Sequence, residues 1–373
     1  MLELQPKANR SRLMLAVSPV LALLSTVVMG YLLFLYLGKD PVRALQILLL
    51  QPFSTASSIG ELIVKGTPLL LIALGLSLGF KAKVWNIGAE GQFIAGALGG
   101  GAFALAVYPT GGWWLLPAMC LIGTLCGVVW AAIPAFLRTR FNASEILVSL
   151  MLSYVAVLFL SVMVAGPLRD PSGINMPESR LLQDDATLPI LISGTRGHIG
   201  ILIALAIAIL FWILDSRHLI GFQGKVFGQA PEAALYGGFT ERQVVFSTLL
   251  ISGGLAGLAG VLDVAGPNGQ LTDRISVGYG FTAIIVAFLG QLHPLGIVIA
   301  SVVMAATYIG GEQIQFEIGM SASITSVFQG LLLLNFLAFQ LFVDYRVEWK
   351  HPSWKRGGQP LQASRRLSQA AGK

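Results

Sequence analysis

Charged residues are scarce in this sequence. Asp, Glu, Lys and Arg make up 11% of its 373 residues, against about 25% in soluble domains. Hydrophobic residues make up 55%, and the mean hydropathy is +0.76. A compact soluble fold of this length could not bury so much apolar surface. The composition therefore predicts a polytopic membrane protein.

Cysteine is also rare. The two cysteines, Cys120 and Cys126, are six residues apart, which on a helix is about 240° of rotation, so they face different ways. They indicate neither a disulfide nor a metal site. The four histidines have no spacing that suggests ligation. We therefore expect no metal and no cofactor.

A phosphate-binding loop of the form G-x-x-x-x-G-K-[ST] is missing. Gly224-Lys225 lacks the upstream glycine and is followed by Val226. The patterns H-E-x-x-H and G-x-S-x-G are missing as well. The chain is therefore not expected to bind ATP in that mode or to act as an enzyme.

Long apolar runs are abundant, and a spanning helix needs about 20 such residues. Only helices and closed barrels span membranes, and barrel strands would alternate in units of about ten residues. The predicted fold class is an all-α polytopic membrane protein. Ten spans are expected, at residues 13–37, 61–80, 85–107, 113–137, 143–165, 199–214, 244–265, 279–292, 295–310 and 323–343. The eighth and ninth are short and separated only by His293-Pro294, so they could instead form a re-entrant hairpin.

The basic residues predict the orientation. With both termini in the cytoplasm, 17 of the 24 Lys and Arg residues lie on that side and 7 on the other. This placement explains the net charge of +6 without a nucleic-acid partner. The predicted permeation domain is 1–345, with an outer loop at 166–197 and a cytoplasmic loop at 215–243. The basic tail, 346–373, is expected to be disordered and suits an anionic inner leaflet.

The cytoplasmic loop contains a predicted short helix. Pro231 suits the first helical position, Glu232 complements the positive helix start, and Gly237-Gly238 suits its end. A helix of residues 231–236 is too short to be stable alone in water, so it must dock on something. It either rests on the membrane face or inserts into a groove of a partner ATPase.

Longer motifs resemble one family of transporters. "GELIVKGTPLLLIALGLSLGFKAKVWNIGAEGQFIAGAL" resembles ABC permeases of the branched-chain amino acid/ribose class, in the branch for nucleosides and simple sugars. "APEAALYGGFTERQVVFSTLLISGGLAGLAGV", "GYGFTAIIVAFLGQLHPLGIVIAS" and "FQGL" at 328–331 resemble later parts of the same branch. The family usually has Asn-Pro where Ala230-Pro231 stands, and often Ala-Gly-Ile where Gly237-Gly238-Phe239 stands.

The resemblance implies an ATP-driven importer working by alternating access in a bacterial plasma (inner) membrane. Its implied partners are an ABC ATPase subunit, a paralogous permease subunit or a second copy of this chain, and an extracytoplasmic substrate-binding lipoprotein. The implied cargo is a nucleoside, a purine-related compound or a simple sugar. The residues expected to couple to the ATPase are Ala230, Pro231, Glu232, Ala233, Ala234, Tyr236 and Gly237.

Three polar residues, Asn86, Glu90 and Gln92, open the third span and are candidates for the substrate pathway. Asn86 is expected to be the N-cap, which places Glu90 about 6 Å inside the membrane. Glu90 then either complements the helix start and reaches Lys83 or the amides of a neighbouring helix, or it lines the route. A stripe of small residues, Gly91, Ala95 and Gly99, should let another helix approach closely.

A second glycine-opened span begins near residues 276–281 on the opposite side. Together the two fit an inverted repeat of helices 2–5 and 7–10, whose interface commonly carries the substrate. Tyr279 and Phe281 either stack on a base or sugar or anchor the helix at the interface. The rival hypothesis is a stand-alone ion-coupled carrier with Glu90 as its coupling acid.

Three further polar positions are expected to be structural. Asn142 and Glu145 fit a capping box at the start of the fifth span. Asp263 and Asn335 are expected to form hydrogen bonds between helices.

Overall fold

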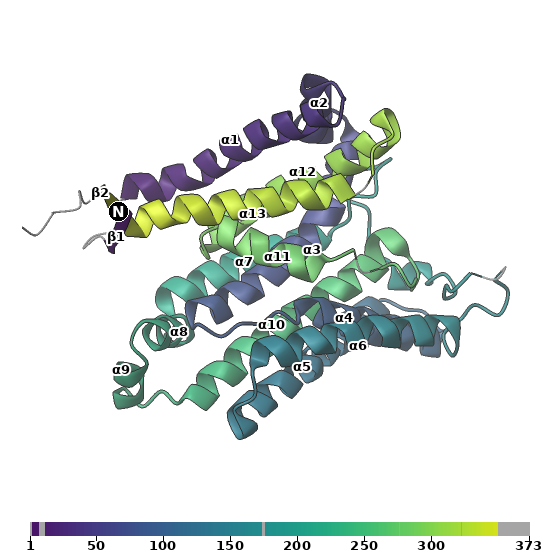
Figure 1. The fold of residues 1–373 in the computed structure, drawn as a ribbon. Coiled ribbons are helices and arrows are strands. Elements are labelled where there is room, and N and C mark those ends of the chain that lie inside the picture. The colour runs from purple at the N-terminus through teal and green to yellow at the C-terminus, as the bar shows by residue number, and fades with distance from the viewer. Residues whose placement is uncertain (1, 7–11, 174–175, 276, 322, 350–373) are drawn as a thin grey trace, which may run out of the picture.

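The computed structural model describes residues 2–6, 12–173, 176–275, 277–321 and 323–349. Within these residues, nine helices are long and apolar enough to cross a membrane, and they form one bundle (Figure 1). They are α1 (Arg12–Tyr36), α3 (Ala56–Lys81), α4 (Ala89–Val107), α5 (Leu115–Phe141), α6 (Glu145–Ala165), α7 (Gly200–Arg217), α10 (Glu241–Asp263), α12 (Pro294–Ile318) and α13 (Ser323–Asp344). The predicted all-α polytopic class is confirmed.

The predicted eighth span, 279–292, is only half a span. Helix α11 (Tyr279–Leu289) has 11 residues, about 16 Å at 1.5 Å per residue, whereas the hydrocarbon core is about 30 Å thick. The ninth span, predicted to end at residue 310, continues to Ile318. The helix continues through Gly310. This glycine packs against the backbone of Leu48, where a Cβ would overlap it.

Several shorter elements lie between the spans. They are α2 (Pro41–Leu49), α8 (Leu219–Gln229), α9 (Pro231–Tyr236), the 3-10 turns η1 (Gln51–Phe53) and η2 (Asp184–Ala186), and the π-helical turn η3 (Val264–Asn268) that continues α10. Helix α9 has the predicted bounds. Helices α2 and α8 were not predicted. The Asp40 carboxylate caps α2 by accepting from the amides of Val42 and Arg43, at 3.0 and 3.3 Å.

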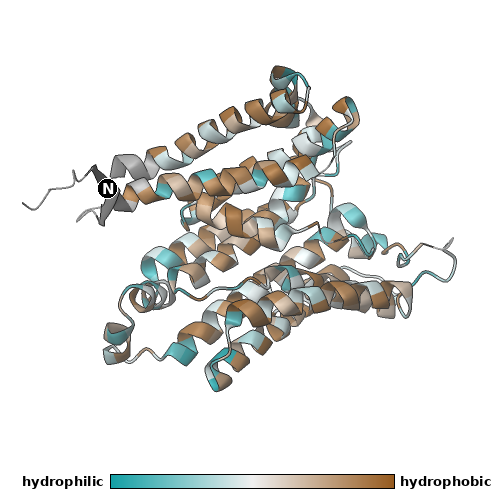
Figure 2. Cartoon of the chain, in the orientation of Figure 1, coloured by the Kyte–Doolittle hydropathy of each residue, from teal (hydrophilic) through white to brown (hydrophobic). Residues whose placement is uncertain are grey.

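One end of the bundle carries both described chain ends, and we call it the terminal face. There β1 (Leu2–Pro6) pairs antiparallel with β2 (Tyr345–Trp349), and α8 and α9 lie at the same end in Figure 1, on the left. The opposite end carries α2. Figure 2 shows hydrophobic residues along the helices and hydrophilic residues gathered mostly at their ends and in the connections.

The start of the predicted disordered tail is ordered, because Arg346–Trp349 belong to β2. Residues 350–373 lie outside the described residues, so the prediction for them is untested.

Helix α3 is the centre of the bundle. Its residues 66–80 are all buried, and it packs against α7, α10, α11 and α12. Helices α1 and α13 pair at one edge (Figure 1, top). There the Asn335 amide donates to the Thr26 hydroxyl over 3.0 Å, as predicted for an interhelical hydrogen bond. Asp263 instead accepts from Asn268, at 2.8 Å, within the continuation of its own helix.

Glycines bring α4, α5 and α10 into backbone contact. A Cβ on Gly96 of α4 would overlap the backbone of Gly257 on α10, and one on Gly127 of α5 would overlap the carbonyl of Gly253. Small residues let helices approach to backbone contact in a membrane, where the hydrophobic effect does not drive them together.

Candidate functional site

The segment between α3 and α4, residues 82–88, is not helical. After α3 it turns back, with the Val84 amide donating to the Gly79 carbonyl over 2.8 Å, and Lys83 adopts a positive φ of 56°. The Trp85 amide donates to Glu145, the first residue of α6, and the Gly91 amide donates to the hydroxyl of Ser153. Ser153 lies eight residues further along α6, about 12 Å.

Glu90 is the second residue of α4. The prediction counted its position along a helix that starts after Asn86, but the segment before Ala89 is non-helical.

Asn86 is not the N-cap of α4; Gly88 takes that position. The side chains of Asn86 and Gln92 instead bind each other, Nδ2 to Oε1 over 2.8 Å and Nε2 to Oδ1 over 3.1 Å. Asn86 also donates to the hydroxyl of Ser252 on α10 over 3.0 Å. Both amides are buried. In this conformation they brace α4 and its entry segment against α10.

The carboxylate of Glu90 faces the start of a second helix. It accepts from the amide of Gly278, the N-cap of α11, over 3.1 Å, and from the amide of Gly280. The Glu90 residue is 2% exposed. Gly280 packs on the backbone at Glu90, where a Cβ would overlap the Glu90 nitrogen. The acid thus joins the start of α4 to the start of α11.

Tyr279 and Phe281 lie in different environments. Tyr279 is buried, with its ring 5.7 Å from that of Phe93 and 5.9 Å from that of Tyr308. Phe281 is 39% exposed. The hydroxyl of Tyr308 shares a hydrogen bond with that of Thr282 at 2.7 Å, so α11 is held by α12 as well as by α4. Of the two candidate aromatic residues, only Phe281 presents its ring outward.

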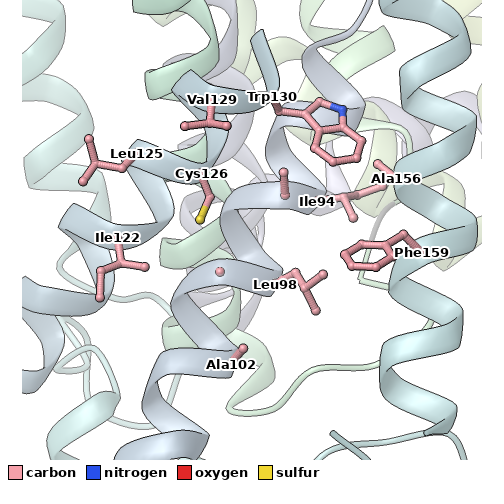
Figure 3. Close-up of a pocket in the computed structure, with 12 residues that line it drawn as sticks. Ile94, Leu98, Ala102, Ile122, Leu125, Cys126, Val129, Trp130, Ala156 and Phe159 are labelled. Carbon is pink, nitrogen blue, oxygen red and sulfur yellow. The ribbon is translucent and has the colours of Figure 1, made fainter. Parts of the chain in front are cut away.

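The small-residue stripe on α4 contacts two helices. Gly91 packs on Ser153 of α6, and Gly99 packs on Cys126 of α5. Ala95 lines an apolar groove of about 400 Å³ between α4, α5 and α6. Figure 3 shows its walls, with Trp130 as the one labelled side chain that carries a nitrogen. The groove presents little polar surface for a hydroxyl-rich cargo.

Helix α9 is attached to the bundle through a small buried contact. Ala234 is its one buried residue, in a cluster with Ala82 after α3, Phe227 of α8 and Val245 of α10. The neighbouring Tyr236 is 94% exposed. Helix α9 therefore has an anchored side and an apolar side with no cover in the described chain.

Helix α8 connects α9 to the centre of the bundle. A Cβ on Gly228 would overlap the carbonyl of Lys81, the last residue of α3. Asp215 of α7 binds both the Lys81 ammonium at 2.8 Å and the Lys225 ammonium at 3.1 Å. The end of α3, the end of α7 and α8 thus form one braced unit on the terminal face.

His198 lies outside the spans and has a strongly lowered pKa. It is buried before α7, its Nδ1 accepts from the Gly200 amide over 3.2 Å, and its Nε2 has no hydrogen-bond partner. Burial lowers the pKa of His198 to about 4, so the imidazole is neutral at physiological pH. Among the described residues, no group of three or more His, Cys, Asp or Glu side chains could hold a metal ion.

The family model for "Branched-chain amino acid transport system / permease component" matches residues 58–337. The chain belongs to this family of permeases. It is similar to the glucose ABC transporter permease protein TsgB13 of Haloferax volcanii, with 32% identity over 93% of both chains. It is also similar to the guanosine ABC transporter permease protein NupP of Bacillus subtilis, with 27% identity over 85% of this chain and 91% of the relative.

A third relative is the nucleoside ABC transporter permease protein NupB of Lactococcus lactis, with 25% identity over 90% of this chain and 93% of the relative. Haloferax volcanii and Lactococcus lactis each contribute a second matching permease, TsgC13 and NupC. No solved structure matches the chain.

The permease is therefore a membrane subunit of an ABC importer, and a stand-alone ion-coupled carrier is excluded. It has no ATPase of its own, and ATP is hydrolysed by a partner subunit. The family works with an ATPase and a substrate-binding protein. The permease is a multi-pass membrane protein, and a bacterial plasma membrane fits it.

Proposed function

We propose that this permease imports neutral nucleosides or related simple sugars and is driven by an ATPase that grips α9. The cargo class is supported by the relatives, which are named for glucose, guanosine and nucleosides. The second partner is a paralogous permease, which is supported by a second matching permease in each of two related organisms. A substrate-binding lipoprotein delivers the cargo from the other side.

The exposed side of α9 is the observation that supports its coupling to the ATPase. The excess of basic residues supports a cytoplasmic position for the terminal face, where the ATPase works. A six-residue helix has little stability of its own, and here Ala234 alone is buried while Leu235 and Tyr236 lie open to solvent. Aromatic residues that fill a partner's pocket commonly supply much of the binding energy of an interface. Tyr236 suits that role.

Motion of α9 has two routes into the bundle. One runs through α8 to the end of α3, by the Gly228 contact and the ion pairs of Asp215. The other runs through Phe239 and Val244 into α10, which touches α4 and α5 at backbone distance. Both routes consist of close-packed contacts, so a displacement of α9 is transmitted with little loss.

The test uses the assembled transporter in proteoliposomes, with uptake and ATP hydrolysis measured on the same sample. Tyr236→Ala and Glu232→Ala should each lower uptake per ATP hydrolysed about tenfold, the effect of losing roughly 1.4 kcal/mol of contact energy. Tyr154→Ala is the matched control, because Tyr154 is also exposed but lies in the middle of α6, away from both ends of the bundle. Wild-type coupling in both α9 variants would overturn the proposed role of α9.

The cargo is tested separately by competition. A neutral nucleoside or a simple sugar in excess should inhibit uptake of the labelled cargo, whereas a branched-chain amino acid should not. Inhibition by the amino acid alone would refute the cargo class and leave the role of α9 standing.

A further inference from the structure

We propose that Glu90 is a positioning residue: its fixed negative charge holds the start of α11 inside the bundle. Helix α11 is a half-span that starts there, and the backbone amides of its first turn have no partner within the helix. The carboxylate of Glu90 binds two of them, at Gly278 and Gly280. The proposal rests on family membership and not on the cargo or on α9.

The geometry requires both side-chain oxygens of Glu90 to accept hydrogen bonds. Oε1 takes the Gly278 amide and Oε2 takes the Gly280 amide. An ionised carboxylate offers two acceptor oxygens, whereas an amide replaces one of them with a donor. Gln at position 90 would therefore bring an N–H group against a backbone N–H group of α11.

The charge is matched by its surroundings. Each helix start carries roughly half a positive charge, and Glu90 lies in the first turn of α4 while facing the first turn of α11. One carboxylate between two helix starts is thus close to neutral as a unit. This accounts for an acid with 2% exposure within the membrane-spanning bundle.

The surrounding contacts depend on the position that Glu90 sets. Gly280 lies on the backbone of Glu90, Tyr279 packs edge-on against Phe93, and Thr282 pairs with Tyr308. All three contacts involve the first turn of α11. Phe281, the outward-facing ring, lies in the same turn. Release of Glu90 should therefore move Phe281 relative to α6.

The experiment measures this movement directly. Spin labels are placed at Phe281→Cys on α11 and Leu158→Cys on α6, in the assembled transporter with Cys120 and Cys126 replaced by alanine. With Glu90 present we expect one narrow distance distribution. Glu90→Ala should broaden it and lower the uptake rate about tenfold or more, because charged hydrogen bonds are lost. Added formate, a small carboxylate, should narrow the distribution and restore part of the uptake.

Two variants keep the outcome decisive. Glu90→Gln has nearly the same volume, and it should broaden the distribution as well, which answers the case in which Glu90→Ala fails to assemble. Glu312→Gln is the control: Glu312 is an acid on α12 that binds the side chain of Lys65 at 2.8 Å, and its loss should leave the distribution unchanged.

A narrow, wild-type distribution in Glu90→Gln would overturn the proposal, and so would wild-type uptake in that variant. The α9 variants provide the separation from the proposed function. Tyr236→Ala should lower coupling without broadening the distance distribution.

Discussion

The glycine contacts between α5 and α10 allow a quantitative prediction from one pair of substitutions. Gly257 and Gly254 lie one turn apart on α10 and both are buried. A Cβ on Gly257 would lie 2.5 Å from the carbonyl oxygen of Gly123 and 3.0 Å from the Cα of Gly127. A Cβ on Gly254 would meet only side-chain methyl groups, 3.1 Å from Val128 and 3.4 Å from a threonine of α5.

The two substitutions differ in what must move. Carbon atoms in contact prefer about 3.5–4.0 Å, so Gly257→Ala pushes the backbone of α5 away by about 1 Å, whereas Gly254→Ala needs only a small side-chain adjustment. Overpacking of this kind costs about 1–3 kcal/mol. Replacing a helical glycine by alanine gains about 1 kcal/mol of helix propensity in either variant. That gain cancels in the comparison, so Gly257→Ala should be about 1–3 kcal/mol less stable than Gly254→Ala.

The measurement is the free energy of unfolding in mixed micelles, followed by tryptophan fluorescence and repeated for the unsubstituted permease. Gly254→Ala should be as stable as the unsubstituted chain or slightly more stable. If the two variants unfold within about 0.5 kcal/mol of each other, the limit of ordinary surface substitutions, then α5 and α10 are not in backbone contact and the packing argument fails.

Two further predictions concern buried polar groups. Burial lowers the pKa of His198 from 6.5 to about 4, so on acidification the unfolded chain binds a proton before the folded chain does. The free energy of unfolding should therefore fall by up to about 3 kcal/mol as the pH drops from 6.5 towards 4. In a pH series of unfolding free energies, His198→Gln should remove this loss, whereas His218→Gln, at an exposed position, should retain it. Asn86→Ala should lower the free energy of unfolding by about 1–3 kcal/mol, because it leaves the buried Gln92 amide without its partner. A double-mutant cycle with Gln92→Leu should show a coupling energy above 0.5 kcal/mol. Additive losses of stability would contradict the pairing.

The fold class and the helix α9 could be predicted from local patterns. Apolar runs of spanning length give most of the long helices, because the bilayer sets their length. Helix α9 is bounded by Pro231 at its start and Gly237 after its end, and both act through their own backbone conformations. Features of this kind are determined by residues that lie within or next to them in the sequence.

The predictions failed where a second segment decides the outcome. Asn142 ends α5 in the left-handed conformation, with φ of 54°, and Ser144 caps α6 instead. Glu145, predicted for a capping box, binds Arg138 across the turn at 2.5 Å. The local sequence allows either cap, and the packing of α5 against α6 selects one. In the same way, the apolar residues of α11 do not reveal that its first turn lies within the bundle.

The role of Glu90 could not be found in its own stretch of sequence, because its partners, Gly278 and Gly280, are 188 and 190 residues away. The predicted inverted repeat provides a signal that could have found them. In a repeat of helices 2–5 and 7–10, α4 is the counterpart of α11, and counterparts related by a two-fold axis in the membrane plane can meet only at that axis.

The meeting of α4 and α11 at their starts, after glycines in both cases, supports that symmetry. So does the close contact of the next counterparts, α3 and α10, where a Cβ on Gly75 would lie 2.8 Å from the Cα of Ser252. The remaining counterparts, α5 and α6 against α12 and α13, lie on opposite sides of the bundle (Figure 1). On this interpretation the repeat places an open helix start from each half at one point. A single carboxylate at that point serves both, which explains why the first turn of α4 carries an acid and the first turn of α11 does not.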